Sequence, residues 1–276
     1  MFSKDLLPIV RPHPSDTGGL AYAEGMEEGS MILAGKLRSP ASGETYEIRN
    51  GYLDLLKRRI GADNVANLTN LLPGAGPAYE PLWRVHSLTL LTGEPFPTDQ
   101  EVRIISDLAR LRRGGLYLDL GCSAGLYTRN LSRALGDNGN VVGIDISPSM
   151  LREAARRARN IGARPSFVRT DAHSLQFADS CFSGVVCGGT LNELGDPARA
   201  LREIRRALEP GGRLAIMGIL RARTPRGRRL QRFVSTGGIR FFEPDELRSL
   251  LDHAGFDPDP LRRHGPVFFA GATRRG

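Results

Sequence analysis

A short glycine-rich segment, residues 119–125, carries the residue types best suited to holding a small charged molecule. It reads Asp-Leu-Gly-Cys-Ser-Ala-Gly, follows a run of apolar residues and precedes a helix-like pattern. Gly121 and Gly125 allow the main chain to turn tightly and to approach a ligand without an intervening Cβ atom. A helix that begins near Gly125 would offer unpaired backbone N–H groups to a carboxylate or another anion. The segment therefore indicates a ligand-binding loop.

Two further aspartates repeat this pattern at the ends of strand-like runs. Asp145 closes the run VVGID, 20 residues beyond Gly125, and Asp171 follows the run SFVRT. With Asp119, three successive runs each end in a carboxylate. Parallel strands place their carboxyl ends at one edge of a sheet, where ligands bind. A carboxylate at the position of Asp145 can accept hydrogen bonds from ribose hydroxyls.

The spacing of the glycines indicates that the ligand of this loop is not a dinucleotide. Dinucleotide sites use Gly-x-Gly-x-x-Gly to bring the backbone against a pyrophosphate. This loop has Gly-x-x-x-Gly with Ser123 in the middle, and no phosphate-loop lysine is present. The Asp119 carboxylate would repel a phosphate but suits a cationic amino group. A ligand with ribose, adenine, an ammonium group and a carboxylate, and without phosphate, matches S-adenosylmethionine.

Alternating strand-like and helix-like patterns surround the loop from residue 98 onward. The apolar runs lie at residues 116–120, 141–146, 184–187 and 214–220, and the helical patterns at 126–135, 148–160 and 197–208. Runs of four to seven apolar residues between helices predict an α/β fold with a parallel sheet covered on both faces.

Two regions of different character precede this domain. Residues 1–60 contain short alternating patterns and the turn dipeptide Asn50-Gly51, which predict a small β module. Residues 61–97 are rich in glycine and proline and predict a linker of short turns. The chain therefore divides into a β module, a linker, and a ligand-binding domain at 98–276.

Four segments of the domain match a known family in order: DLGCSAG, VVGIDISPSML, FVRTDAHSLQF and LREIRRALEPGGRLAIM. They resemble the motifs of the class I S-adenosylmethionine-dependent methyltransferases, in the type 11 group that includes quinone-biosynthesis C-methyltransferases. The resemblance implies a Rossmann-like, doubly wound, mostly parallel seven-stranded sheet with a reversed last strand near residues 265–274. It also implies S-adenosylmethionine as the cofactor.

The resemblance assigns roles to individual residues. It implies that the loop holds the methionine part of the cofactor, that Asp145 binds the ribose, and that Asp171 with the backbone of Ala172 contacts the adenine amino group. The cofactor-binding residues that we expect are Asp119, Gly121, Ser123, Gly125, Asp145, Ile146, Met150, Asp171, Ala172, Cys187, Gly188 and Tyr79. Two positions depart from the family pattern, because Ser123 replaces the central glycine of the loop and Phe182-Ser183 replaces a Phe-Asp pair.

Resemblances outside the domain concern the two preceding regions. Residues 78–84 are similar to a subfamily that includes chloroplast methyltransferases of uncertain substrate. We expect Tyr79 and Trp83 there either to cover the cofactor as a lid or to pack the linker on the core. The segment LRSPASGETYEIRNGYLDLL is similar to a small zinc-ribbon module with a Cys-Pro-x-Cys pattern. Because Ser39 and Ser42 occupy the cysteine positions, we expect the shape of the ribbon without a metal.

The segment GGTLNEL follows the fourth strand, near the expected place of the methyl acceptor. An amide or a carboxylate there could orient a hydroxyl or an activated carbon, so Asn192 and Glu193 are candidate catalytic residues, although Glu193 could equally cap the next helix. His173 could act as a general base near neutral pH, but its turn lies beside the adenine end. Cys122 and Cys187 are expected as small buried residues.

The balance of charge leaves several partners open. The chain carries 38 Lys and Arg against 30 Asp and Glu, a formal net charge of +8, and arginines gather in residues 221–232. On the ligand edge of the sheet this arginine run could contact phosphate on a substrate, an RNA or a membrane surface. Most charge runs, however, are solvated faces.

The sequence also indicates the cellular compartment in which the protein is expected. No apolar stretch approaches the ~18 residues of a membrane span, and the start of the chain lacks the apolar core of a signal peptide. Three cysteines form neither a disulfide framework nor a CxxC site. We therefore expect a cytoplasmic protein.

Three functions remain open on these grounds. The first is a C- or O-methyltransferase that acts by in-line transfer on a small, lipophilic, quinone-like acceptor. The second is an RNA methyltransferase, suggested by the arginine run and the ribbon-like module, although neither an Asn-Pro-Pro-Tyr tetrapeptide nor a catalytic-cysteine motif is present. The third is a non-catalytic nucleoside-binding protein that retains the pocket.

Overall fold

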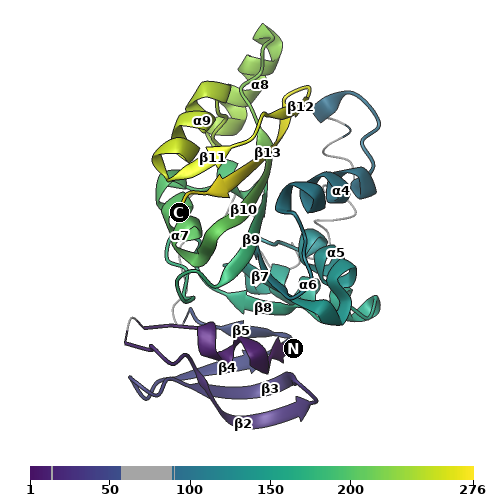
Figure 1. The fold of residues 1–276 in the computed structure, drawn as a ribbon. Coiled ribbons are helices and arrows are strands. Elements are labelled where there is room, and N and C mark those ends of the chain that lie inside the picture. The colour runs from purple at the N-terminus through teal and green to yellow at the C-terminus, as the bar shows by residue number, and fades with distance from the viewer. Residues whose placement is uncertain (14, 57–88, 90) are drawn as a thin grey trace.

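A computed structural model of the chain describes residues 1–13, 15–56, 89 and 91–276 (Figure 1). Within these residues, seven strands of the predicted domain form the continuous path of one sheet. They are β6 (Gly115–Leu120), β7 (Gly139–Asp145), β8 (Ser166–Arg169), β9 (Phe182–Gly188), β10 (Leu208–Ile219), β11 (Phe256–Pro258) and β13 (Val267–Arg274). Their order across the sheet is β8-β7-β6-β9-β10-β13-β11, and the short strand β12 (Arg262–His264) pairs with β13.

The strand directions confirm the predicted mostly parallel sheet with a reversed last strand. The five strands from β8 to β10 run parallel. In contrast, β13 is antiparallel to β10, with Arg213 opposite Thr273 at one end and Ile219 opposite Val267 at the other. This strand falls within the segment 265–274 in which the reversal was expected.

Six helices within the described residues accompany the sheet. They are α4 (Thr98–Ala109), α5 (Leu126–Leu135), α6 (Pro148–Asn160), α7 (Pro197–Ala207), α8 (Pro225–Ser235) and α9 (Pro244–His253). The bounds of α5 and α6 agree with the predicted helices. Both α6 and α7 begin at a proline, directly after Ser147 and Asp196, whose side chains accept backbone N–H groups of the first turn.

The helices form layers on the two faces of the sheet, as the parallel strands require. In Figure 1, α4, α5 and α6 cover one face, α7 and α9 cover the other, and α8 projects from the end of the molecule. Side chains of one strand alternate between the two layers. Tyr117 of β6 packs in the core under α4 and α5, whereas Leu118 packs in the core with Leu201 of α7.

The expected β module forms at the N-terminus. Its strands are β1 (Phe2–Ser3), β2 (Ala21–Glu28), β3 (Met31–Arg38), β4 (Thr45–Arg49) and β5 (Tyr52–Asp54), with a short 3₁₀ helix, η1 (Lys4–Ile9), after β1. Strand β5 pairs in parallel with β8, with Leu53 opposite Val168. The module therefore continues the central sheet of the domain.

The turn between β3 and β4 holds the two serines at the cysteine positions of a ribbon. The hydroxyl of Ser39 donates a hydrogen bond to Asp16 and accepts the N–H of Ser42 at 3.0 Å. The carbonyl of Ser39 accepts the N–H of Gly43 at 2.9 Å. Hydrogen bonds thus close this turn, and the part of the chain that the structure describes contains no cluster of three His, Cys, Asp or Glu that could hold a metal.

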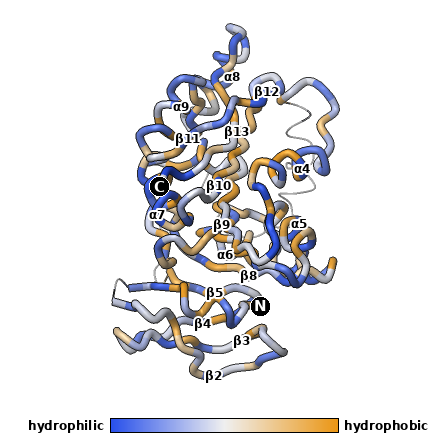
Figure 2. The backbone as a smooth tube through the Cα atoms, viewed as in Figure 1, coloured by the Kyte–Doolittle hydropathy of each residue, from blue (hydrophilic) through white to orange (hydrophobic). Residues whose placement is uncertain are grey.

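The hydrophobic residues concentrate on the central strands, as Figure 2 shows for β9, β10 and β13. No helix among the described residues has the length and apolarity needed to cross a membrane. The sheet forms the buried centre of the domain. The loops that follow β6, β7, β8 and β9 lie at its carboxyl edge and carry the polar residues of the predicted site. The predicted lid residues Tyr79 and Trp83, and most of the linker, lie outside the described residues.

Candidate functional site

The glycine-rich loop after β6 adopts a backbone that requires small residues. Gly121, Ser123 and Gly125 have positive φ angles of 69°, 47° and 76°. A Cβ atom on Gly121 would lie 2.1 Å from Oγ1 of Thr190, so a larger residue would collide with the segment after β9. A Cβ atom on Gly125, the residue before α5, would lie 2.9 Å from Cβ of Ala154 in α6. The loop is therefore held tightly between two neighbouring segments.

Asp119 lies beneath the loop and secures it. The residue is 2% exposed, and its Oδ2 accepts hydrogen bonds from the backbone N–H and from Oγ1 of Thr128, at 2.9 and 2.5 Å. Thr128 is the third residue of α5, so its N–H is one of the donors that the helix itself cannot satisfy. The carboxylate also places a negative charge at the positive end of the helix. Asp119 thus fixes the helix whose N-terminus adjoins the loop.

Asp145 links the loops that follow β6 and β7. Its Oδ2 accepts the N–H of Ser123 at 2.9 Å, and its Oδ1 accepts the N–H of Ser147 at 2.8 Å. Burial raises the pKa of Asp145, although these backbone hydrogen bonds act in the opposite direction. Each carboxylate oxygen has a second lone pair. Asp145 can therefore hold both loops and still accept a hydrogen bond from a ribose hydroxyl.

The residues expected around the adenine come from adjacent strands. Ile146 is half-buried at the end of β7, and Met150 is buried in the first turn of α6. Ala172 is buried in the loop after β8. Strands β7 and β8 are neighbours in the sheet, and Nε of Arg169 donates to the carbonyl of Ile146 at 3.0 Å. The two loops therefore lie side by side.

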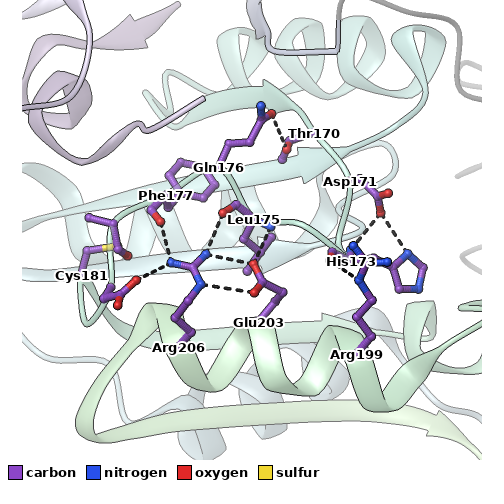
Figure 3. A network of polar contacts seen from close by, with 12 residues as sticks. Thr170, Asp171, His173, Leu175, Gln176, Phe177, Cys181, Arg199, Glu203 and Arg206 are labelled. Atoms are coloured by element: carbon purple, nitrogen blue, oxygen red, sulfur yellow. Dashed lines mark hydrogen bonds and ion pairs between the residues drawn. The ribbon is translucent and has the colours of Figure 1, made fainter. Parts of the chain in front are cut away.

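Helix α7 fixes the loop after β8 through a network of polar contacts (Figure 3). Arg206 donates to the carbonyl oxygens of Phe177 and Leu175, at 2.8 and 2.7 Å. Glu203 accepts the N–H of Leu175 at 2.9 Å and forms an ion pair with Arg206. Because an arginine can donate several bonds in a fixed plane, this pair ties one helix to successive carbonyls of the loop.

His173 and Asp171 form a pair at the start of the same loop (Figure 3). Oδ1 of Asp171 accepts the N–H of His173 at 2.8 Å and lies 3.0 Å from Nδ1 of its ring. Nε2 of His173 is buried and has no hydrogen-bond partner within the described part of the chain. A ring whose Nδ1 proton faces Asp171 presents Nε2 as an acceptor. This atom could pair with an amino group of a ligand.

Asn192 ties the segment after β9 to two other segments. It belongs to the short 3₁₀ helix η4 (Thr190–Asn192) and is 2% exposed. Its amide nitrogen donates to the carbonyl oxygens of Ile219 and Arg240, at 2.9 and 2.6 Å, and its Oδ1 accepts the N–H of Ile219 at 3.0 Å. Both amide hydrogens are therefore bonded to the backbone, and these bonds fix the segment that leads to Glu193.

Glu193 lies at this edge and is partly buried. Burial, and to a smaller extent the negative charge of Asp145, raises the pKa of Glu193 to about 7. A carboxyl group that titrates near neutral pH can take up and release a proton under physiological conditions. Space adjoins the same segment, because a Cβ atom built on Gly189 meets no atom within 4 Å.

The cysteines near the site are held as neutral thiols. Burial raises the pKa of Cys187 to about 12 and that of Cys122 well above its usual value. Since the thiolate is the reactive form, neither is a nucleophile at neutral pH. Gly188 follows Cys187, and a Cβ atom there would lie 2.3 Å from the ring of Tyr127, which packs the end of β9 against α5.

The groups around the loop fit a nucleoside without phosphate. A pyrophosphate would face the buried carboxylates of Asp119 and Asp145, which repel it. An ammonium group and ribose hydroxyls are attracted by the same carboxylates. A bare backbone turn at Gly121 and an acceptor at Nε2 of His173 complete a site that fits S-adenosylmethionine.

Comparisons with known proteins agree with this interpretation. A family model described as a methyltransferase domain matches residues 118–216. The ubiquinone/menaquinone biosynthesis C-methyltransferase of Haemophilus ducreyi is 31% identical over 179 residues, which cover 56% of this chain and 69% of that protein. The chain belongs to the class I S-adenosylmethionine-dependent methyltransferases.

Two further proteins are similar to this methyltransferase. The enzyme of the same name from Enterobacter sp. (strain 638) is 38% identical over 117 residues, which cover 42% of this chain and 47% of that protein. The chain thus spans about half the length of this relative. Phosphoethanolamine N-methyltransferase 2 of Haemonchus contortus, solved with S-adenosyl-L-methionine, has a TM-score of 0.59 at 16% identity, over 74% of this chain and 61% of that chain. This likeness shows a common fold.

The methyltransferase carries the predicted site residues on four loops of one sheet edge. The loop after β6 carries the residues expected to contact methionine, and the ends of β7 and β8 carry those expected to contact ribose and adenine. The segment from Cys187 to Glu193 lies at the end of β9. Tyr79 lies outside the described residues. The role of each residue toward the cofactor or the acceptor stays a prediction.

A hollow of about 880 Å³ lies beside this edge, between α8 and the segment that follows it. It is lined by four arginines, by three apolar residues and by polar residues that include one glutamate. These are Arg221, Arg228, Arg232 and Arg240, then Pro225, Ile239 and Phe241, and then Gln231, Ser235 and Glu246. The N–H of Arg240 donates to the carbonyl of Asn192 at 2.7 Å, in addition to the bond from the Asn192 amide. The hollow therefore adjoins the segment that carries Glu193.

Two contributors to the site were not singled out from the sequence. Thr128 bonds to Asp119, and its place in the first turn after an acidic strand end could have indicated this. Arg240 meets Asn192 across 48 residues of chain, and no local pattern predicts such a contact. The sequence predicts the arginine run either as a solvated face or as a contact to phosphate on a substrate, an RNA or a membrane surface. In the structure, Arg228 and Arg232 line the hollow.

Proposed function

We propose that the protein transfers a methyl group from S-adenosylmethionine to a small, lipophilic, quinone-like acceptor. The observation that carries this proposal is the partly buried Glu193, with a pKa of about 7, at a sheet edge that adjoins both the cofactor loops and a hollow. Apolar side chains of the hollow would pack on a ring, and its arginines would donate to the oxygens. The names of the Haemophilus and Enterobacter relatives support a quinone-like acceptor.

The cofactor loops would mainly position the reacting groups. When bound, S-adenosylmethionine supplies a methyl group on a positive sulfur, and the acceptor bonds to that carbon as the carbon–sulfur bond breaks and then loses a proton. Asp119 and the loop at 121–125 would orient the methionine part, and Asp145 would hold the ribose. Alignment of two reactants can lower the barrier by ~7–11 kcal/mol, so these residues would supply much of the catalysis.

Glu193 would accept the proton that the acceptor loses. Above pH 7 its carboxyl group is largely ionised, and its burial favours return to the neutral form. Asn192 would act as a positioning residue. Its amide bonds to the carbonyls of Ile219 at the end of β10 and of Arg240 beside the hollow, and so fixes the segment before Glu193. The neutral thiols of Cys122 and Cys187 would serve as packing groups.

Binding and transfer can be tested on the full chain. Calorimetry with S-adenosylmethionine measures the affinity of the pocket, and methyl-tritiated S-adenosylmethionine with a lipid extract or with total RNA measures transfer. We expect binding, and label in the lipid extract. Glu193→Gln should lower the transfer rate without a comparable change in affinity, whereas the exposed Glu28→Gln should leave both unchanged.

The same assay contains the outcomes that contradict the proposal. Label in RNA alone would replace the acceptor class by a nucleic acid. Binding without label in either extract would indicate a nucleoside-binding protein without transfer. Absence of affinity for S-adenosylmethionine would remove both methyltransferase hypotheses for this pocket.

A further inference from the structure

Helix α8 exposes two large apolar side chains one turn apart. Leu230 is 65% exposed and Phe233 is 76% exposed. Within the described residues, the other exposed large hydrophobic side chains are Met26 and Ile161, which lie on different elements. Residues three apart on a helix share a face. The outer face of α8, defined by Arg226, Arg229, Leu230 and Phe233, therefore presents an apolar pair to solvent.

The same face carries positive charge. Arg226 and Arg229 precede Leu230 by four residues and one residue, and the spacing of all four members is i, i+3, i+4 and i+7, which is one side of a helix. The side chain of neither arginine forms a hydrogen bond or an ion pair with another described residue. The outer face thus combines two exposed hydrophobic groups with two uncompensated cations.

The surrounding segment concentrates the net charge of the protein. Between Arg221 and Phe242 there are seven arginines and no acidic residue. The rest of the chain carries 31 basic and 30 acidic side chains, so its charges nearly cancel. Two of the seven, Arg221 and Arg240, form ion pairs with Glu243 and Glu246 just beyond this segment. The other five have no ion-pair partner among the described residues, so the field of the segment is positive and attracts an extended anionic surface.

Contacts on the opposite side fix the orientation of α8. Gln231 donates to the carbonyl of Leu220 at 2.9 Å and accepts the N–H of Ala222 at 2.7 Å. Arg228 and Arg232 line the hollow on this side. The helix projects from the end of the molecule (Figure 1), so its outer face is accessible to a flat surface.

We propose that the outer face of α8 docks the protein on an anionic lipid surface. Helices that combine basic residues with exposed Leu and Phe lie in the interface of a bilayer, with the apolar groups among the acyl chains and the basic groups at the phosphates. An RNA surface would use the arginines but would gain little from the aliphatic Leu230. The lipid therefore accounts for all four residues, and the inference does not depend on the methyl acceptor.

Vesicle sedimentation of the full chain tests this proposal. The probes are vesicles of phosphatidylcholine alone and vesicles of phosphatidylcholine with phosphatidylglycerol. We expect binding to the second at least about tenfold tighter than to the first, and a loss of about tenfold or more in the double variant Leu230→Ser/Phe233→Ser. Arg226→Gln/Arg229→Gln should weaken binding to the anionic vesicles and remove part of its salt dependence.

Matched variants control for general effects on the surface. Met26→Ser/Ile161→Ser removes two exposed apolar side chains elsewhere, and Arg49→Gln/Arg103→Gln removes two exposed arginines elsewhere. Both should bind vesicles like the unmodified protein. Calorimetry with S-adenosylmethionine in the same samples should give an unchanged affinity for every variant, which separates this proposal from the proposed function.

Two results would overturn the inference. The first is equal binding to both kinds of vesicle, or anionic binding that the Leu230→Ser/Phe233→Ser variant retains. The second is binding of total RNA that depends on Arg226 and Arg229 but not on Leu230 and Phe233, since that would assign the segment to a nucleic acid.

Discussion

Ser123 and Asp145 are joined by a hydrogen bond across the site, from the N–H of Ser123 to Oδ2 of Asp145 at 2.9 Å, although 22 residues separate them. Ser123 stands where the family pattern has a glycine, and its φ angle of 47° lies in the left-handed region. That conformation is uncommon for a residue with a side chain. The carboxylate at the end of the next strand therefore stabilises the loop in this conformation.

Replacement of this carboxylate should weaken the binding of the cofactor. Asp145→Asn keeps the size of the side chain but places an amide N–H₂ group against the N–H of Ser123 or Ser147. Loss of a hydrogen bond to a charged group corresponds to a drop in S-adenosylmethionine affinity of roughly 10- to 100-fold. Calorimetry measures this change, with Asp137→Asn in the exposed turn after α5 as a control. An affinity that stays the same in Asp145→Asn would exclude Asp145 from the pocket.

Gly121→Ala should destabilise the protein more than the same change at another glycine of equal φ. Both Gly121 and Gly162 have φ of +69°, but a Cβ atom on Gly121 would meet Thr190 at 2.1 Å whereas one on Gly162 meets no atom within 4 Å. The left-handed conformation costs about 1–2 kcal/mol at either site, and overpacking at Gly121 adds about 1–3 kcal/mol. Urea unfolding of the two variants checks the difference, and equal losses would show that Thr190 moves away without cost.

The sequence predicted the central elements well because their patterns are local. Apolar runs between amphipathic segments suffice to define β6, β7, α5 and α6, and the family motifs place the reversed strand β13. The path of the N-terminal module was not predictable in this way. The parallel pairing of Leu53 with Val168 joins segments 115 residues apart, and short strands carry no signal that specifies such a partner.

The sequence could predict a site residue where its chemical type and its place at a strand end point to one role. The sequence predicts Asp145 at the end of a strand, and the structure confirms this position at the end of β7. Its contact with a ribose stays a prediction, and its bonds to Ser123 and Ser147 depend on loop geometry. For Asn192, the residue type and its place after the fourth strand suggest contact with an acceptor. Its three bonds to backbone groups of other segments became visible only in the folded chain.

The stability of the protein should depend on pH through Glu193. The folded state binds this proton more tightly than the unfolded chain, since the pKa of Glu193 is raised from 4.5 to about 7. The free energy of unfolding therefore falls as pH rises from about 4.5 to about 7. Glu193→Gln lacks this titration, so it should gain up to about 3 kcal/mol relative to the unmodified protein at pH 8 and almost nothing at pH 4.

Denaturant unfolding at several pH values measures this effect. Glu28→Gln, at an exposed position of β2, controls for the loss of a carboxylate in general. A difference between Glu193→Gln and the unmodified protein that is independent of pH would show that Glu193 has an ordinary pKa in the folded state.

Purified protein should contain no stoichiometric zinc. The chain has three cysteines, at positions 122, 181 and 187, and none is in the N-terminal module. In that module, Ser39 and Ser42 hold the turn by hydrogen bonds, whereas a structural zinc site requires thiolate or imidazole ligands. Elemental analysis after dialysis without a chelator checks this, and one zinc per chain would refute the assignment of these serines.

Asn192→Ala should separate positioning from direct catalysis. In this variant, three buried backbone groups lose the Asn192 side chain as their hydrogen-bond partner: the carbonyls of Ile219 and Arg240 and the N–H of Ile219. This loss should lower the free energy of unfolding by roughly 2–4 kcal/mol. We expect methyl transfer to fall, because the segment before Glu193 loses its anchor, while the affinity for S-adenosylmethionine changes less than about threefold. Unfolding, calorimetry and transfer assays on the same preparation distinguish the two roles. A residue that contacts only the acceptor would lose transfer at unchanged stability, and that combination would contradict the positioning role.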